Sequence, residues 1–232
     1  VCVSSADVVG RDYVGGYVGL TTNGAMTSCS YGNTVEGVSY VGGIAGRAGP
    51  LDDCTNSGTV KASGHHAGGL AGYCMSMDGC VNSGAVSARG LDSQGGLYLG
   101  GLAGYSHSVS YSTNSGTVST TVKGSYVGGI SGYLYSDSIM SVVTNTSDIT
   151  SQGDYVGGLF GYVDKDQERA DYTISQANNS GEVVSTGSYV GGIAGYIVTM
   201  EFSALYHGIH TTNLSVCVSS ADVVGRDYVG GY

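Results

Sequence analysis

The sequence predicts an all-β chain wound as a right-handed parallel β-solenoid, or β-helix, with about seven rungs in each 215-residue unit. Three observations predict it. Glycine contributes 42 of the 232 residues and proline 1. A short phrase built on Gly-Gly recurs along the chain, and Val, Thr, Tyr and Ile dominate between the glycines without a helical period. Collagen would need abundant proline, and glycine disfavours helical bundles.

The longest repeat predicts the domain organisation. Residues 1–17 and 216–232 both read VCVSSADVVGRDYVGGY, at an offset of 215 residues. We therefore expect residues 1–215 to be one tandem unit of a continuous solenoid, with 216–232 beginning the next identical unit. The alternative is that the repeat does not belong to the natural chain.

Two shorter phrases alternate inside this unit. The first has the form YVGGIAG, as at Tyr40, and the second the form CTNSGTV, as at Cys54. A repeat this short cannot bury its own apolar face, so stacked neighbours must cover it. The aliphatic residue after each Gly-Gly and the Val after each NSG then form two columns, which we place in the core. The first of these columns contains Ile44, Leu70, Leu102, Ile130, Leu159 and Ile193.

Stacking also predicts structural roles for glycine and asparagine. Glycine columns allow neighbouring backbones to bend or approach closely. The Asn of NSG suits a tight turn because it tolerates the left-handed region, and stacked amides can bond to one another as a ladder. The residues to which we assign these roles are Gly42, Gly43, Gly46, Gly100, Gly101, Gly104, Asn56, Asn82 and Asn114.

The two phrases together resemble the GLUG-motif repeats of bacterial surface proteins. The resemblance covers nearly the whole chain, although the first copy, YVGGYVG from Tyr13, departs from the pattern. It implies a secreted or cell-surface location and a structural or adhesive role. It brings no ligand, because the matching glycines are architectural.

Charge and hydropathy exclude two classes of partner. The net charge is −10, with 8 basic residues against 18 acidic ones, which argues against nucleic acid. No apolar run is long enough to insert into a membrane.

Cysteines share one column of the second phrase. Cys29, Cys54 and Cys80 occupy its first position, as do Cys2 and Cys217. Stacked rungs separate such residues by about the Cα distance that a disulfide needs, so Cys54 and Cys80 are candidates for a bridge. The alternative is a ladder of buried thiols that pack as small hydrophobic groups.

Aromatic residues form two further columns, one before each Gly-Gly and one after each GxG. Their functional interpretation is a platform for glycans or partner chains, and the structural one, which we prefer, is ring stacking that stiffens the solenoid. The sequence leaves open which face the rings occupy. The first column contains Tyr13, Tyr40, His66, Tyr98, Tyr126, Tyr155, Tyr189 and Tyr228, and the second contains Tyr73, Tyr105, Tyr133, Tyr162 and Tyr196.

No pattern indicates a cofactor, a metal site or a catalytic constellation, so we expect no enzymatic activity. His207 and His210 have a chelating spacing only on a helix, and no helical pattern surrounds them. HExxH, GxSxG and phosphate-loop motifs are missing from the sequence.

The last rungs carry the longest insertions. Residues 163–176 hold the densest charge cluster, and residues 197–212 are apolar. Loops of this length often contact a partner, and the alternative is that they fold back on the solenoid. The candidate contacts are Phe202, Leu205, Tyr206, Asp164, Asp166 and Arg169.

These observations favour a structural function, an extracellular or cell-surface filament or stalk of tandem β-solenoid units. Its partners would be copies of itself, joined covalently or end to end. The alternative is an adhesin-type binding module that recognises a glycan or a host protein through the Tyr columns and the late loops.

Overall fold

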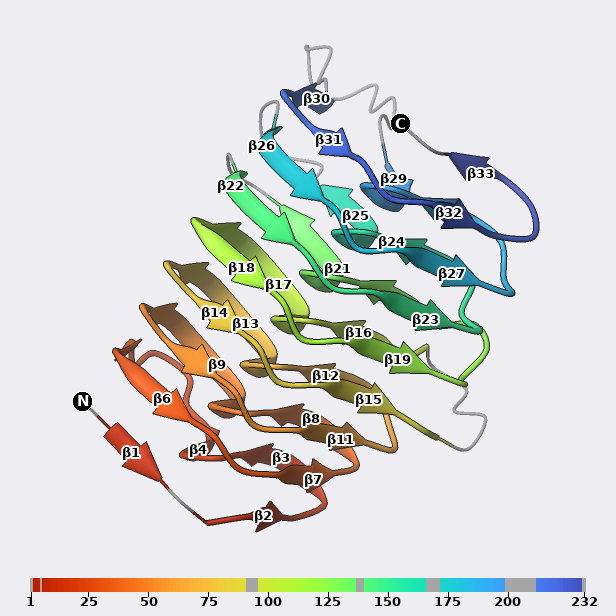
Figure 1. Ribbon diagram of the computed structural model, residues 1–232. Helices are drawn as coiled ribbons and strands as arrows, with labels where there is room; N and C mark the ends of the chain where they lie inside the picture. The colour runs from red at the N-terminus through yellow and green to blue at the C-terminus, as the bar shows by residue number, and fades with distance from the viewer. Residues whose placement is uncertain are drawn as a thin grey trace, which may run out of the picture.

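A computed structural model describes residues 2–4, 6–90, 96–136, 140–165, 172–198 and 212–230. Within these residues the chain is all-β, with no helix, and its strands assemble into four parallel sheets. Each rung passes through sheets A, B, C and D in turn before the next rung begins. The rungs stack along one axis, and the two ends of the chain lie at opposite ends of the stack (Figure 1). The prediction of a parallel β-solenoid is confirmed.

The sheets are defined by their strands, given in stacking order. Sheet A contains β1 (Cys2–Ser4), β6 (Cys29–Tyr31), β10 (Thr55–Asn56), β14 (Val81–Asn82), β18 (Ser112–Asn114), β22 (Met140–Asn145), β26 (Tyr172–Asn179), β30 (Thr212–Ser215) and β31 (Val218–Ser219), the last two both pairing with β26. Sheet B contains β2 (Val8–Val9), β7 (Val35–Gly37), β11 (Val60–Ala62), β15 (Val86–Ala88), β19 (Val118–Thr120), β23 (Ile149–Ser151), β27 (Val183–Ser185) and β32 (Val223–Val224).

Sheets C and D complete each rung. Sheet C contains β3 (Asp12–Gly15), β8 (Ser39–Gly42), β12 (His66–Gly68), β16 (Tyr98–Gly100), β20 (Tyr126–Gly128), β24 (Tyr155–Gly157), β28 (Val190–Gly191) and β33 (Val229–Gly230). Sheet D contains β4 (Val18–Leu20) and β5 (Met26–Thr27), which both pair with β9 (Ala45–Asp52), followed by β13 (Ala71–Asp78), β17 (Ala103–Ser110), β21 (Ser131–Ser136), β25 (Phe160–Lys165) and β29 (Ala194–Ile197).

The register keeps equivalent positions of the repeat above one another. In sheet B, Val60 pairs with Val86 and Val86 pairs with Val118. Both predicted aliphatic columns lie in the core, where Leu70 and Val60 are fully buried. Inward residues of each strand therefore become continuous apolar ridges that run parallel to the axis.

The glycines serve close approach between rungs. A methyl group at Gly101 would collide with the carbonyl oxygen of Gly129 and with the side chain of Asn114 in the next rung. At Gly100 it would collide with the carbonyl oxygen of Ala103 in the same rung and with that of Ile130 in the next rung. Both glycines have negative or extended φ, so the space they leave is what the fold requires.

At the corner between sheets D and A, one residue of each successive rung has positive φ and lies in the left-handed region. The sequence did not predict this feature. The residue stands one position before the cysteine column. Because several residue types share the conformation, no single letter signals it. The residues are Ser28, Asp53, Gly79, Tyr111, Val142, Gln176 and Val216.

The late insertions are shorter than the sequence suggests. Sheet D continues through Lys165 and sheet A resumes at Tyr172, so both ends of the expected loop 163–176 are strand. Likewise β29 extends to Ile197, and β30 begins at Thr212. Hydrogen bonding to the preceding rung extends these strands beyond the repeat phrases.

Candidate functional site

The asparagine side chains form an amide ladder inside the stack. The Nδ2 atom of Asn56 donates to Oδ1 of Asn82 at 2.8 Å, and Asn82 donates to Asn114 at 2.9 Å. The ladder continues through Asn145 to Asn179, with 2.8 Å at each step. All members are buried. The amides thus satisfy one another in an apolar interior, where unpaired polar groups would be costly.

Each amide also closes its own turn. In the first member, Nδ2 donates to the carbonyl of Gly58 at 2.9 Å and Oδ1 accepts from the Gly58 amide at 3.2 Å. The expected left-handed conformation is wrong for these asparagines, because Asn56, Asn82 and Asn114 do not have positive φ. Their side-chain hydrogen bonds hold the turn instead.

The cysteine column contains free thiols. Cys29, Cys54 and Cys80 are buried, and the Sγ of Cys80 lies 3.3 Å from the carbonyl oxygen of Leu51. The neighbouring Cys80 thiol lowers the pKa of Cys54, whereas the Cys54 thiol and burial raise the pKa of Cys80. Of the two interpretations left open, the structure contains the thiol ladder and not the Cys54–Cys80 disulfide.

The two aromatic columns meet where sheets C and D join, and we call this surface the aromatic corner. Within a column most neighbouring rings stack in parallel, as in Tyr126 and Tyr155 with centroids 4.7 Å apart and planes 5° apart. The exceptions are in the first column, where Tyr98 meets His66 at 65° and Tyr126 at 46°. Tyr133 and Tyr162 stack at 5.2 Å in the other column. Between columns the rings meet edge to face, as in Tyr155 and Tyr162 at 83°.

The corner lies outside the core. Its rings are half-buried or exposed, whereas Ile44, four residues after Tyr40, is fully buried. Tyr13, Tyr40, Tyr189 and Tyr228 reach this position with positive φ. Tyr98, Tyr126 and Tyr155 reach the same side without positive φ, so the left-handed backbone is not required for this placement.

Polar groups attach to the corner at several rungs. The hydroxyl of Tyr133 donates to the Asp164 carboxylate at 2.5 Å, and the hydroxyl of Tyr73 lies 2.9 Å from Nε2 of His107. The Arg47 guanidinium lies over the Tyr73 ring, 4.5 Å from its centroid. Burial, followed by the contact with Asp164, raises the pKa of Tyr133. Asp164, expected at a loop surface, is therefore engaged within the stack.

His66 replaces tyrosine at one rung of the first column. Its ring stacks on Tyr40 at a centroid distance of 4.4 Å and 8° between planes. Its Nδ1 atom is buried and makes no hydrogen bond. Burial, then repulsion from His65 and Arg47, lowers the pKa of His66 to about 4, so the imidazole is neutral at physiological pH.

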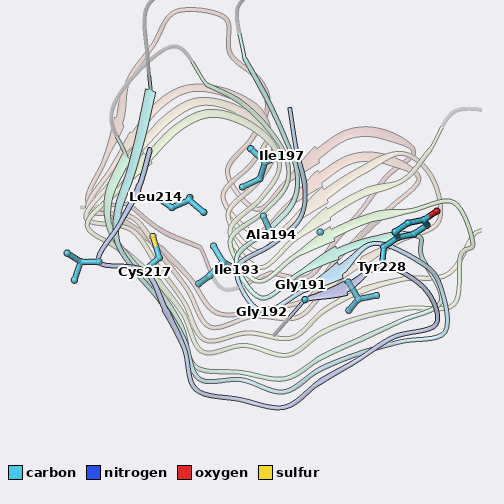
Figure 2. Close-up of a pocket in the computed structure, with 12 residues that line it drawn as sticks. Gly191, Gly192, Ile193, Ala194, Ile197, Leu214, Cys217 and Tyr228 are labelled. Carbon is cyan, nitrogen blue, oxygen red and sulfur yellow. The ribbon is translucent and has the colours of Figure 1, made fainter. Parts of the chain in front are cut away.

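The C-terminal end of the stack contains a cavity of about 360 Å³ (Figure 2). Ile193, Ala194 and Ile197 lie on one side, and Leu214 and Cys217 lie across from them. Side chains near this end are unusually exposed for apolar residues. Among them are Val216 (71%), Tyr228 (75%) and Leu214 (50%). The cavity therefore opens at the end of the hydrophobic core, where no rung covers it within the described residues.

A second pocket, of about 400 Å³, lies on the outer side of sheet B. Lys61 and Arg89 line it together with Glu36, Ser63 and Ser87. Two cations face one carboxylate here, which leaves a small positive excess on a protein of net charge −10.

Several predicted contact residues cannot be placed. Phe202, Leu205, Tyr206, Asp166 and Arg169 lie outside the described residues. Among the residues that are described, no group of three or more His, Cys, Asp or Glu side chains is arranged to hold a metal ion. The same part of the chain contains no helix able to cross a membrane.

Comparison with known proteins identifies no relative. No family model, no curated protein and no solved structure matches this chain. The resemblance to GLUG-motif repeats therefore stays a prediction, and the function must be argued from the geometry.

Proposed function

We propose that the chain is a structural segment of an extracellular or cell-surface filament or stalk, built from tandem GLUG-type solenoid units. The observation that carries the proposal is the continuity of the stack. Sheet B joins Val8 at one end to Val223 at the other, and these are the same position of the 215-residue repeat. A unit that begins and ends on the same sequence is suited to continue into the next unit without a change of register.

Side-chain ladders support the same role. Amide hydrogen bonds and stacked rings run parallel to the axis beside the backbone ladders. Each stacked aromatic pair contributes about 0.5–1.5 kcal/mol beyond its buried area. Bonds aligned with the axis resist stretching and bending, which is the mechanical property that a stalk needs.

The aromatic corner gives little support to the alternative of a glycan-binding adhesin. A sugar that stacks on an aromatic ring needs an exposed ring face. In the corner, the faces contact the next ring of the column and the edges of the facing column. The geometry is therefore better explained by stiffening than by ligand capture.

The experiment is to express one, two and three units in tandem and to measure particle length by electron microscopy. With right-handed winding and about seven rungs per unit, each unit should add roughly 34 Å at a rung spacing of about 4.8 Å. Particles that widen without lengthening would contradict the proposal. Surface labelling of intact source cells with an antibody against the unit tests the location, and a signal only after lysis would contradict it.

A further inference from the structure

The second aromatic column holds tyrosine rings in continuous contact through four rungs in the middle of the stack. Tyr73, Tyr105, Tyr133 and Tyr162 follow one another with centroids 5.1, 5.2 and 5.2 Å apart. Their planes differ by 13°, 7° and 14°. The chain contains 19 tyrosines and no tryptophan, so the phenol is its most easily oxidised aromatic group. Parallel rings at this distance allow an electron to pass from one rung to the next.

Two hydroxyls of this column have a side-chain base within hydrogen-bond distance. In both cases the base comes from the following rung, two positions after that rung's own tyrosine. Tyr73 meets His107 at 2.9 Å, and Tyr133 meets Asp164 at 2.5 Å. At the rung between them, the same position holds Tyr135, whose phenol is not a base at neutral pH. The repeat therefore brings a proton acceptor only to particular rings.

The contact between Tyr133 and Asp164 has the better-defined direction. An ionised carboxylate can only accept, so the phenol is the donor. Between Tyr73 and His107 the direction depends on the tautomer of the imidazole. The strand of Tyr133, β21, pairs with β17 on one side and with β25 on the other, so its ring is stacked on both faces. Tyr133 is thus the ring at which an electron and a proton can leave together.

A proton acceptor matters here because these rings are neutral phenols. The pKa of a tyrosine is ordinarily about 10. Burial raises the pKa of Tyr105 and raises that of Tyr162 to about 12. Burial, followed by the hydrogen bond to Asp164, also raises the pKa of Tyr133. A neutral phenol becomes a strong acid when it loses an electron, so a base already within hydrogen-bond distance makes the oxidation easier.

From this arrangement we propose that the aromatic corner is a site of one-electron oxidation, in which Tyr133 carries the radical and Asp164 accepts its proton. The oxidant is a one-electron acceptor such as a ferryl haem or an oxidised metal complex. It takes one electron, the O–H bond of Tyr133 breaks, and the proton passes to a carboxylate oxygen of Asp164. A neutral tyrosyl radical remains. Oxidation that begins at Tyr105 or Tyr162 reaches Tyr133 by electron transfer through the stack. The inference does not depend on the proposed filament.

Flash photolysis of the full chain tests the proposal. The probe is tris(bipyridine)ruthenium(II), with a cobalt(III) ammine as the irreversible electron acceptor. Light then produces ruthenium(III), a cation that is attracted to a protein of net charge −10. One ruthenium(III) returns to ruthenium(II) for each tyrosyl radical that forms. We expect a tyrosyl signal by electron paramagnetic resonance. A nitroso spin trap followed by peptide mass spectrometry should place the adduct mainly on Tyr133.

Three conservative variants separate a redox role from a structural one. Tyr133→Phe and Tyr105→Phe are a matched pair, because each removes one hydroxyl and keeps a stacked ring. The first should lose the long-lived radical, and the second should keep it. Asp164→Asn can still accept the hydrogen bond but cannot take up the proton, so radical formation should slow at least about tenfold. Thermal unfolding of each variant shows whether the fold is retained.

Other outcomes overturn the proposal. Spin-trap adducts mainly on another tyrosine or on a cysteine would contradict the assignment to Tyr133, as would the absence of any tyrosyl signal. An undiminished radical in Tyr133→Phe would do the same. An unchanged rate in Asp164→Asn would show that the hydrogen bond to Tyr133 is structural only. The spin-trap experiment uses the unaltered chain, so it decides the assignment even where a variant fails to fold.

Discussion

The first and last rungs have identical sequences but different environments. Val14 is 5% exposed because the second rung covers it, whereas its counterpart Val229 is 43% exposed. Tyr13 and Tyr228 differ in the same direction, at 37% and 75%. The comparison shows that the burial of a residue in a solenoid is not determined by its amino-acid type or by the sequence of its own rung. It is supplied by the neighbouring rung: the following rung covers Val14, whereas no described rung follows Val229.

The largest expected effect compares the same substitution at the two ends. Val14→Asp places a carboxylate in a covered site without a partner, and we expect it to lower the free energy of unfolding by about 3–4 kcal/mol. Val229→Asp should lower it by less than about 1 kcal/mol, because water reaches the site. Urea denaturation followed by circular dichroism measures both. Similar losses for the two variants would show that the environments are alike in solution.

Acid should destabilise the aromatic corner through His66. Unfolded histidine takes up a proton near pH 6.5, whereas the folded ring resists protonation until its pKa of about 4. The free energy of unfolding should therefore fall as the pH drops from 6.5 towards 4, by up to about 3 kcal/mol from this residue.

The matched variant is His66→Tyr, which continues the column between Tyr40 and Tyr98. It should remove this share of the pH dependence. The free energy of unfolding of the variant should therefore fall less than that of the parent protein as the pH drops below 6.5. Thermal unfolding at a series of pH values is the measurement. Parallel curves for the two proteins would rule out a neutral, buried His66.

Within the cysteine column, the thiol in the last rung should react faster than the thiols in the middle of the stack. Cys217 is half-buried in the last rung, whereas Cys54 and Cys80 are fully buried. We expect iodoacetamide to modify Cys217 at least about 100-fold faster, because the buried thiols react only after local opening. The measurement is peptide mass spectrometry over time, with urea-unfolded protein as the control. Early modification of Cys54 would mean that its lowered pKa outweighs burial.

We expect the smallest effect from a substitution that extends the amide ladder into the last rung. Ser219 stands at the ladder position after Asn179, and its buried Oγ atom has no hydrogen-bond partner. Ser219→Asn should accept from Asn179 and raise the free energy of unfolding by about 1 kcal/mol. Ser4→Asn, the same change in the first rung, faces Tyr31 and should bring no gain. Equal effects in urea denaturation would contradict the ladder as the cause.

The sequence alone predicts much of the fold. The Gly-Gly and NSG phrases predict parallel stacking, both aliphatic columns and the amide ladder, because registered stacking places equal letters side by side. The same reasoning finds the members of the aromatic columns. It does not find their face, since simple alternation would place Tyr40 on the same side as the buried Ile44. The end cavity is also missed, because it is made by Ile197 and Leu214, which belong to different strands.

The sequence by itself determined the repeat period, because in a stacked repeat each residue contacts the equivalent residue of the next rung. Only the tertiary structure decided what the period leaves open. It placed Asp164 against Tyr133, kept Cys54 and Cys80 as thiols, and left Val229 uncovered where Val14 is buried. These features arise from contacts between columns and from the ends of the stack. A repeat pattern specifies the contacts along a column, but neither its neighbours across the rung nor the point at which stacking stops.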